Sequence, residues 1–508
     1  MGLYDFGFYD LIERNAASFG SRPAWFEVDD QRILTFAQYK YKVDQLACGL
    51  QNAGINKGDR IGALGKNSLE FFCLYGAAAA LGAIVLPINW RLSIEEVLFN
   101  LNDCEPAMLF VDSEYQGMIG DSKDKLPSVR ECYGMKSPEG AFPGFDTLLQ
   151  YGGNFQPADV SADDGLVIIH TAAVAGRPRG ALLSHGNLIC ANMQINLQLK
   201  LCADDVHLNI LPLFHVGGLF MASGSFHAGA LNVNMSKFDA AQAVGLIEEK
   251  NVSVMFDFSP ILGAILEAHK QSGKSIQSLQ HVAGLESPAV IEEYQELTGG
   301  TFICLYGQTE TSAVATMGCY ADRPGSAGQT IPLANVRIVN DDDKPLPTGE
   351  IGEITVKGPV VFKGYWNLPE DSASTFHGGW HHTGDLGRFD ADGFLWYEGR
   401  KAEKELIKPG GENVYPAEVE KAILQHPAVE KTVVFGVPDP KWKEGIKAVC
   451  QLKSGHTLEP QELIAYVGSR IASFKKPQYV EFVSELPQLE DGSADRVKVK
   501  ELYGGPQG

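Results

Sequence analysis

Short apolar, β-branched runs alternate with helix-like segments through the first two thirds of the chain. The strand-like runs are Leu166–Ile169, His207–Leu211, Val252–Phe256 and Thr301–Leu305, and the helix-like segments include Ala240–Lys250 and Ala289–Leu297. Strands separated by helices favour parallel sheets covered by helices. From Ser21 to about Val361 the pattern therefore predicts an α/β domain with mostly parallel sheets.

The pattern changes twice further along the chain. Near Asn340, Gly, Pro and Asp residues separate short strands and predict a β-rich subdomain. After Gly399 the predicted elements are a helix at 417–425, strands Thr432–Val437 and Ile446–Leu452, and a helix at Pro460–Ala472. We therefore expect a large N-terminal domain over residues 1–400 and a small, mobile α+β domain over 401–508, with a hinge near 399–411.

The longest apolar stretch runs from Phe71 to Pro87 and contains Gly76 and Gly82. It falls short of the roughly 20 residues that a membrane-spanning helix needs. It predicts a buried helix followed by a strand. The first residues are acidic and lack the basic and apolar regions of a secretory signal.

Composition narrows the function classes. The net charge is −21, which disfavours binding to nucleic acid or an anionic membrane and means that a polyanionic ligand needs a local basic pocket. The nine cysteines form no C-x-x-C pair, which argues against a disulfide framework or zinc ribbon. They fit a reducing compartment, so we expect a cytoplasmic protein.

The segment Tyr306–Thr311 reads YGQTET and follows the apolar run Phe302–Leu305. It resembles the Y-G-x-T-E signature of adenylate-forming enzymes, here of the AMP-forming acyl-CoA synthetases. The carboxyl end of a strand is the usual place for a ligand loop in an α/β domain. The resemblance implies a nucleotide site that includes Tyr306, Gly307, Gln308, Thr309 and Glu310. Tyr306 would lie against adenine, Thr309 would hydrogen-bond the α-phosphate, and Glu310 would coordinate Mg²⁺, which prefers carboxylate oxygen.

Two further segments carry the same resemblance. Residues 380–385 read WHHTGD, and the family implies that Asp385 accepts hydrogen bonds from both ribose hydroxyls while Arg400 reaches the same ribose. Residues 410–420 read GGENVYPAEVE and form the most specific match. By resemblance, Gly410 and Gly411 line the tunnel for the pantetheine arm of CoA, since glycine lets a backbone approach a ligand closely.

Supporting matches cover nearly the whole chain. The segment LPLFHVGG places His215 beside the acyl carboxylate as a candidate gate, although a lone histidine is more often a core residue. By resemblance, the adenine-contacting loop comprises Gly284, Leu285 and Glu286. Lys475 lies in a basic turn, where a role at the CoA phosphates competes with that of a solvated charge.

The phosphate loop departs from the family pattern. The family reads T-S-G-T-T-G-x-P-K-G, and residues 171–180 here read TAAVAGRPRG. Thr171 and Gly176 remain, Arg179 replaces the lysine, and Ala172–Ala175 lack the hydroxyls. Such a loop holds phosphate with backbone N–H groups and side-chain hydroxyls, so this loop keeps at most the backbone part.

The C-terminal segment departs as well. Ser493 takes the place of the family's adenylation lysine, with Arg496 or Lys498 as substitutes if the register shifts. A neutral hydroxyl cannot offset developing charge as an ammonium does. The hinge residue is Lys404 or Glu405, with Glu405 nearer the family's position.

Both departures affect formation of acyl-AMP from ATP. Three interpretations remain: a complete acid–CoA ligase, a ligase that only performs thioester formation from acyl-AMP, and a catalytically silent binding protein. The expected ligands are ATP or acyl-AMP, CoA and Mg²⁺. The expected partners are a carboxylic acid or its adenylate, a separate adenylating enzyme under the second interpretation, and a second copy of the chain in a homodimer. The acid stays unnamed, because the pocket segments near His215–Phe220 and Ser312–Met317 are mostly small or apolar.

Overall fold

The computed structural model describes residues 2–3, 5–136, 140–151, 155–174, 177–401, 406–409, 412–440, 442–489 and 494–505, without the side chains of 172–174, 177 and 443. The chain divides into two compact units. The first comprises Met1–Trp90, Leu101–Ile169 and Gly180–Gly399, and the second comprises Arg91–Asn100, His170–Arg179 and Arg400–Gly508.

A nine-stranded sheet forms one half of the first unit, in the order β15-β14-β13-β12-β11-β9-β10-β1-β2. Its strands are β1 (Pro23–Glu27), β2 (Ile33–Thr35), β9 (Val206–Asn209), β10 (Leu231–Asn234), β11 (Val254–Phe258), β12 (His281–Leu285), β13 (Thr301–Tyr306), β14 (Thr316–Cys319) and β15 (Gln329–Thr330). The six central strands from β13 to β1 run parallel, and the strands outside them are antiparallel. Parallel strands align their carboxyl ends, which gathers the loops after β12 and β13 at one edge.

A seven-stranded sheet has the order β18-β8-β7-β4-β3-β5-β6. Its strands are β3 (Arg60–Leu64), β4 (Ile84–Ile88), β5 (Met108–Val111), β6 (Glu131–Gly134), β7 (Gly165–Val174), β8 (Arg177–Ser184) and β18 (Gly364–Tyr365). The strands from β7 to β6 are parallel, and β18 pairs antiparallel with β8.

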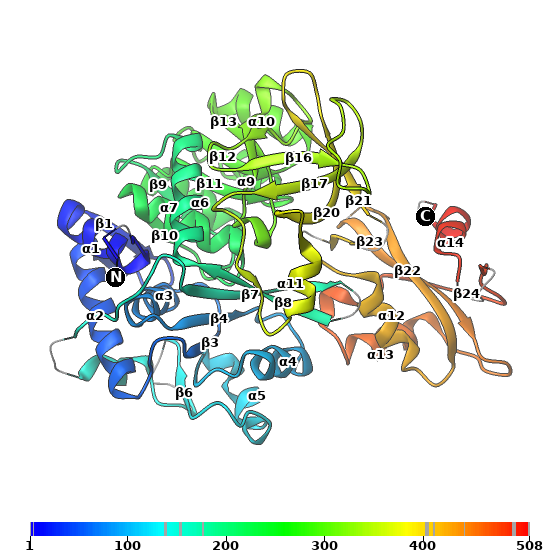
Figure 1. Ribbon diagram of the computed structural model, residues 1–508, viewed down its shortest axis with the longest axis horizontal. Coiled ribbons are helices and arrows are strands. Elements are labelled where there is room, and N and C mark those ends of the chain that lie inside the picture. Colours follow the sequence, from blue (N-terminus) through cyan, green and yellow to red (C-terminus); the bar gives the residue numbers. More distant parts are fainter. Residues whose placement is uncertain are drawn as a thin grey trace. The chain divides into compact units, whose positions relative to one another are not determined.

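Helices connect these strands, as a parallel sheet requires (Figure 1). They are α1 (Phe8–Phe19), α2 (Phe36–Asn52), α3 (Leu69–Leu81), α4 (Ile94–Cys104), α5 (Gln116–Gly120), α6 (His185–Leu199), α7 (Val216–Ala228), α8 (Ala240–Lys250), α9 (Ile261–Ser272), α10 (Pro288–Thr298) and α11 (Pro369–Thr375). Local sequence sets several ends: Ser68 caps α3 by accepting the Phe71 N–H, and Gly82 ends it in a left-handed conformation. Every residue of α3 is buried, which explains its uniformly apolar sequence.

The β-rich part of the first unit is an antiparallel sheet of order β16-β17-β20-β19, with β21 paired to β20. Its strands are β16 (Asn335–Val339), β17 (Gly352–Lys357), β19 (Phe376–His377), β20 (Trp380–Phe389) and β21 (Leu395–Arg400). The two residues between β19 and β20, Gly378 and Gly379, both have positive φ, as a tight hairpin turn needs.

The small C-terminal part packs helices on a three-stranded sheet of order β22-β23-β24. Its strands are β22 (Val429–Asp439), β23 (Lys443–Leu452) and β24 (Tyr479–Val483), and its helices are α12 (Pro416–Leu424), α13 (Pro460–Gly468) and α14 (Arg496–Tyr503). Val419 and Ile423 of α12 and Leu463 of α13 are buried in its core.

The predicted fold class is confirmed: a large N-terminal α/β domain with a β-rich part, and a smaller C-terminal domain. The buried helix and strand predicted for Phe71–Pro87 are α3 and β4, and α8 has the predicted bounds. Several predicted ends were wrong: the strand predicted at Val252–Phe256 is Val254–Phe258, and the one predicted at Thr432–Val437 is Val429–Asp439. The strand predicted to reach Leu211 stops at Asn209, and the helix predicted to reach Ala472 stops at Gly468. Within the described residues, none of the helices combines the length and apolarity that crossing a membrane would require.

Gly284 on β12 tests how tightly the nine-stranded sheet is packed. Its φ is +154°, and a Cβ there would lie 1.9 Å from the carbonyl oxygen of Asp257 on β11. We expect Gly284→Ala to lower the free energy of unfolding by about 1–3 kcal/mol, the usual cost of overpacking. Urea unfolding measures this. The control is Gly117→Ala, whose Cβ meets no atom within 4 Å, and unfolding curves that coincide for both variants would contradict the prediction.

Candidate functional site

The Tyr306–Thr311 segment begins where β13 ends and turns sharply. Gly307 is required at this turn, since a Cβ there would lie 2.1 Å from the carbonyl oxygen of Ala313. Thr309 and Glu310 follow in a short 3₁₀ turn (Thr309–Thr311), and both are buried. The turn therefore holds the predicted phosphate and metal residues next to the carboxyl end of a central parallel strand.

Asp385 joins this segment to the β-rich sheet. Its Oδ2 accepts a hydrogen bond from the Tyr306 hydroxyl at 2.8 Å and another from the Gln308 amide nitrogen at 2.8 Å. Asp385 is 2% exposed, and the Tyr306 ring stacks on Tyr397 with centroids 6.1 Å apart. The structure thus brings together three residues that the sequence assigned to one nucleotide site from positions up to 79 apart.

Glu310 is anchored by a residue that the sequence analysis did not single out. The Tyr365 hydroxyl on β18 donates to Glu310 Oε1 at 2.8 Å, and the Glu310 carbonyl accepts the Phe362 N–H at 3.0 Å. A buried carboxylate needs such donors. The Tyr365 hydroxyl fixes the carboxylate that is predicted to bind Mg²⁺, and the Phe362 N–H holds the backbone of the same residue.

Glu353 on β17 supports the segment that carries Asp385. Its Oε1 accepts the Gly384 N–H at 2.8 Å, and its Oε2 lies 3.1 Å from His382 Nδ1. The Thr383 hydroxyl donates to the Ile354 carbonyl and accepts the Asp385 N–H. The backbone at Thr383 and Gly384, just before Asp385, is therefore held by hydrogen bonds to β17.

His215 caps the N-terminus of α7 and is exposed. The segment before it is held by the Asn67 side chain, which donates to the Leu211 carbonyl at 2.8 Å and accepts the Leu213 N–H at 2.7 Å. The Tyr75 hydroxyl donates to the Leu213 carbonyl at 2.8 Å. The exposed position is compatible with a gate and excludes the alternative of a core histidine.

The predicted adenine-contacting residues end β12. Gly284 and Leu285 are the last two residues of the strand, and the Leu285 side chain is 42% exposed. Glu286 accepts the Ser287 N–H at 2.6 Å, just before α10. These residues lie at the carboxyl end of the strand next to β13.

Of the residues predicted to form the phosphate loop, 171–174 belong to the end of β7 and 177–180 to the start of β8, and these strands are neighbours in the seven-stranded sheet. The Thr171 hydroxyl donates to the Arg179 carbonyl oxygen at 3.3 Å, so these two predicted residues lie opposite each other. Gly176 lies outside the described residues.

In the second unit, the Arg400 guanidinium lies 3.4 Å from the Tyr415 hydroxyl. Arg496 donates to Glu420 and to the Val434 carbonyl at 2.5 and 2.8 Å. Gly410, Gly411, Lys404, Glu405 and Ser493 lie outside the described residues, so their predicted roles stay predictions.

Lys475 is 5% exposed, and its ammonium nitrogen lies 2.5 Å from carboxylate oxygens of both Glu96 and Glu418. Burial alone lowers the pKa of Lys475, but the two carboxylates outweigh burial and hold this pKa above its usual value. Lys475 is therefore a buried, paired charge, and its interpretation as a solvated charge is wrong. Its role at the CoA phosphates stays a prediction.

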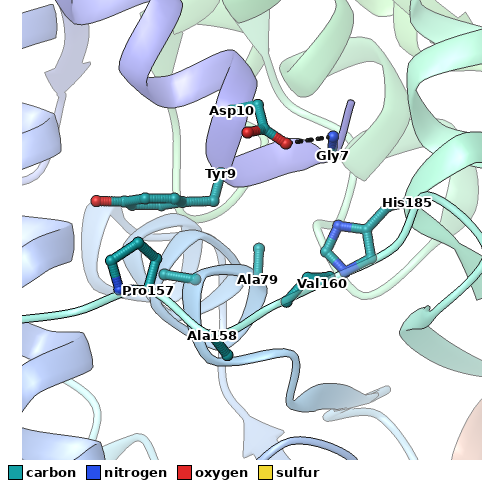
Figure 2. A pocket seen from close by; sticks show the side chains of 9 residues that line it. Gly7, Tyr9, Asp10, Ala79, Pro157, Ala158, Val160 and His185 are labelled. Atoms are coloured by element: carbon teal, nitrogen blue, oxygen red, sulfur yellow. Dashed lines mark hydrogen bonds between the residues drawn. The ribbon is translucent and has the colours of Figure 1, made fainter. Parts of the chain in front are cut away.

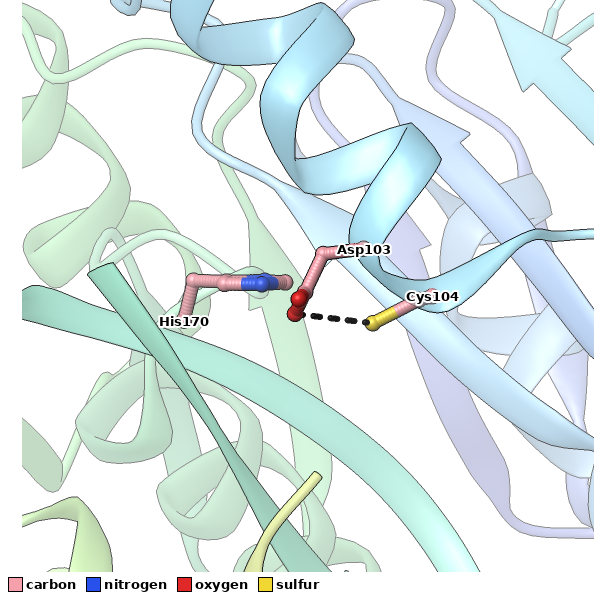
Figure 3. A group of neighbouring side chains, drawn as sticks. All are labelled: Asp103, Cys104 and His170. Atoms are coloured by element: carbon pink, nitrogen blue, oxygen red, sulfur yellow. Dashed lines mark hydrogen bonds between the residues drawn. The ribbon is translucent and has the colours of Figure 1, made fainter. Parts of the chain in front are cut away.

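Two groups of side chains have metal-ligand composition. Asp343, His377 and His382 lie close together, but the two imidazole rings stack with centroids 3.5 Å apart and planes 17° from parallel. A ring nitrogen binds a metal ion in the plane of its imidazole. Two stacked, nearly parallel imidazoles therefore do not direct their nitrogens at one ion. In the other group, Cys104 donates to Asp103 at 4.0 Å at the end of α4 (Figure 3), and His170 belongs to the other unit. We assign no metal to either group.

A small cavity lies between the start of α1 and His185 (Figure 2). It measures about 10 Å³, room for about one water molecule. His185 Nδ1 accepts the Phe8 N–H at 3.3 Å, and burial lowers the pKa of His185 to about 4. This neutral histidine ties α1 to α6, and its cavity is too small for a nucleotide.

The sequence matches the AMP-binding enzyme family over residues 12–366 and the AMP-binding enzyme C-terminal domain over residues 418–492. The chain therefore belongs to the AMP-binding enzymes, and within them it is an acid–thiol ligase of the acyl-CoA synthetase class. Indoleacetate–CoA ligase of Aromatoleum aromaticum is 35% identical, over 93% of this chain and 94% of that protein. Feruloyl-CoA synthase of an Amycolatopsis species is 32% identical, with the same coverage of both chains.

The solved structures agree with this assignment. A double mutant of o-succinylbenzoate CoA synthetase from Bacillus subtilis, bound to a product analogue, superposes with a TM-score of 0.87 at 27% identity, covering 99% of both chains. An anthranilate CoA ligase in complex with anthranoyl-AMP gives a TM-score of 0.75 at 26% identity, covering 99% of this chain and 98% of that one. The family uses ATP or acyl-AMP together with CoA.

Sequence reasoning missed the residues that hold the site in place: Tyr365, Glu353, Asn67 and Tyr75. Each lies 29 to 146 residues from the group it positions. No local periodicity or motif joins such partners. Only the tertiary fold brings them together.

Proposed function

We propose that this protein forms a CoA thioester from a carboxylic acid by way of acyl-AMP, and that adenylation with ATP is its weakened half-reaction. One observation supports thioester formation from acyl-AMP as the retained half-reaction. The Tyr306 hydroxyl and the Gln308 amide both donate to Asp385 and so orient its carboxylate, which is proposed to bind the ribose. The weakened half rests on Ala172–Ala175 and Ser493, which replace hydroxyl donors and an ammonium.

The proposed chemistry needs no side-chain nucleophile. The CoA thiol, as thiolate, attacks the carbonyl carbon of acyl-AMP, a C–S bond forms, the C–O bond to phosphate breaks, and AMP leaves with the electron pair. The protein contributes alignment of thiol and carbonyl and stabilisation of the developing charge. Thr309 and Arg179 are proposed to face the phosphate, Glu310 to bind Mg²⁺ when ATP is used, and Gly410 and Gly411 to border the pantetheine arm.

The proposed acid carries an aromatic ring. The indoleacetate, feruloyl and succinylbenzoate ligases among the relatives support this class. The proposed wall of the pocket includes α7, from Val216, and the segment Ser312–Met317, whose residues are buried. A separate enzyme that supplies the adenylate, a homodimer and a cytoplasmic location belong to the same proposal.

Synthetic acyl adenylates test the retained half-reaction. The purified protein is incubated with CoA and indoleacetyl-, feruloyl-, benzoyl- or decanoyl-AMP, and thioester and AMP are quantified by chromatography. We expect thioester and AMP in equal amounts, fastest with an aryl adenylate. CoA binding without thioester from any adenylate would instead support a silent binding protein, and a preference for decanoyl-AMP would overturn the proposed acid class.

A further inference from the structure

A series of hydrogen bonds leads from the buried Thr375 of α11 through the half-buried Gln308 to Asp385. Thr375 Oγ1 lies 3.1 Å from His381 Nδ1, and His381 Nε2 lies 3.2 Å from Gln308 Oε1. Gln308 Nε2 donates to Asp385 Oδ2 at 2.8 Å. Thr375 and His381 are 5% and 2% exposed. His381 is therefore linked to the proposed ribose carboxylate through one amide.

The partners of Gln308 fix the orientation of its amide. The nitrogen faces two acceptors, Asp385 Oδ2 at 2.8 Å and the Thr383 carbonyl oxygen at 3.4 Å. If the amide were flipped, its oxygen would face these two acceptor oxygens and no hydrogen bond could form. The amide oxygen therefore faces His381, whose Nε2 must carry the proton and donate.

The packing around His381 does not itself require an imidazole. The ring makes edge contacts with Phe362 and Phe376, with centroids 5.4 and 6.0 Å apart. A phenylalanine at position 381 would keep these edge contacts. A histidine adds two contacts that phenylalanine lacks: the Nε2–H donor to Gln308, and Nδ1 beside the Thr375 hydroxyl, which has the His382 carbonyl as another acceptor.

We propose that His381 is a positioning residue for the nucleotide: by donating to Gln308 it holds the amide that orients the Asp385 carboxylate toward a ribose. The inference rests on the proposed function, because it assumes that Asp385 binds the AMP part of the substrate. Its effect is expected on binding of the nucleoside monophosphate and not on the reaction of the acyl carbonyl with CoA.

Two variants separate this role from a structural one. His381→Phe keeps the aromatic packing and removes the donor, and His381→Gln supplies an amide N–H at about the reach of Nε2. We expect His381→Phe to weaken AMP binding, measured by calorimetry, about tenfold, the usual effect of one buried hydrogen bond. The KM for acyl-AMP should rise by about the same factor with kcat nearly unchanged. His381→Gln should recover most of this loss, and the melting temperature of His381→Phe should match that of the wild type.

The control is His456→Phe, which changes an exposed histidine and should leave AMP binding unchanged. Wild-type affinity in His381→Phe would overturn the inference. So would a parallel fall in affinity and melting temperature that His381→Gln fails to recover, since that pattern marks a structural role. If the wild-type protein itself binds neither AMP nor acyl-AMP, the proposed function fails and the inference falls with it.

Discussion

Asp385→Ala is expected to lower kcat/KM for thioester formation from acyl-AMP by about 10²–10⁴. Each hydrogen bond to a charged group contributes about 1.5–3 kcal/mol, and this carboxylate is proposed to accept two from the ribose. The substitution also leaves the buried Tyr306 hydroxyl and Gln308 amide without their shared acceptor. Steady-state kinetics with synthetic acyl-AMP measure the effect.

Asp204→Ala is the matched control, because Asp204 is an exposed aspartate whose side chain pairs with Arg22 on the surface. Its kcat/KM should equal that of the wild type. If the Asp385→Ala protein melts at the wild-type temperature and retains full activity, Asp385 does not contribute to nucleotide binding.

Restoring the family residues in the two altered segments is expected to raise adenylation with ATP by about 10²–10³. The variant carries Ala172→Ser, Ala173→Gly, Val174→Thr and Ala175→Thr together with Ser493→Lys. The hydroxyls and the ammonium would stabilise charge that develops only in the transition state of adenylation, and one such group typically contributes a factor of this size. ATP–pyrophosphate exchange in the presence of the acid measures this half-reaction.

Ser454→Lys is the control, because it adds the same charge at an exposed position in the small domain. Its exchange rate should stay at the wild-type level. An unchanged rate in the restored variant would show that these residues do not limit adenylation.

The order of strands and helices could be predicted because most of them carry their own signal. Helix α8, for example, begins after Asp239, which caps it, and ends at Lys250, before Asn251 in a left-handed conformation. Ends set by distant residues could not be predicted. Ile210 and Leu211 are buried, so their sequence predicts a continuation of β9. The Asn67 side chain instead donates a hydrogen bond to the Leu211 carbonyl, and the strand ends at Asn209.

In the candidate site, too, the residues can be identified from the sequence, whereas their contacts cannot. Tyr306, Thr309, Glu310 and Asp385 stand in motifs that can be recognised one by one. Their contacts depend on the fold: Glu310 meets Tyr365 only because β18 pairs with the edge of the seven-stranded sheet. The contribution of His381 depends on the orientation of one amide, which follows from its acceptors and not from spacing in the sequence.

The central claim is that the protein transfers an acyl group from AMP to CoA better than it makes the adenylate. The most direct test measures both half-reactions on one preparation with one acid: thioester formation from acyl-AMP and CoA, and ATP–pyrophosphate exchange with that acid. We predict thioester formation faster than exchange by about two orders of magnitude or more. Exchange as fast as thioester formation would contradict the claim and identify a complete ligase.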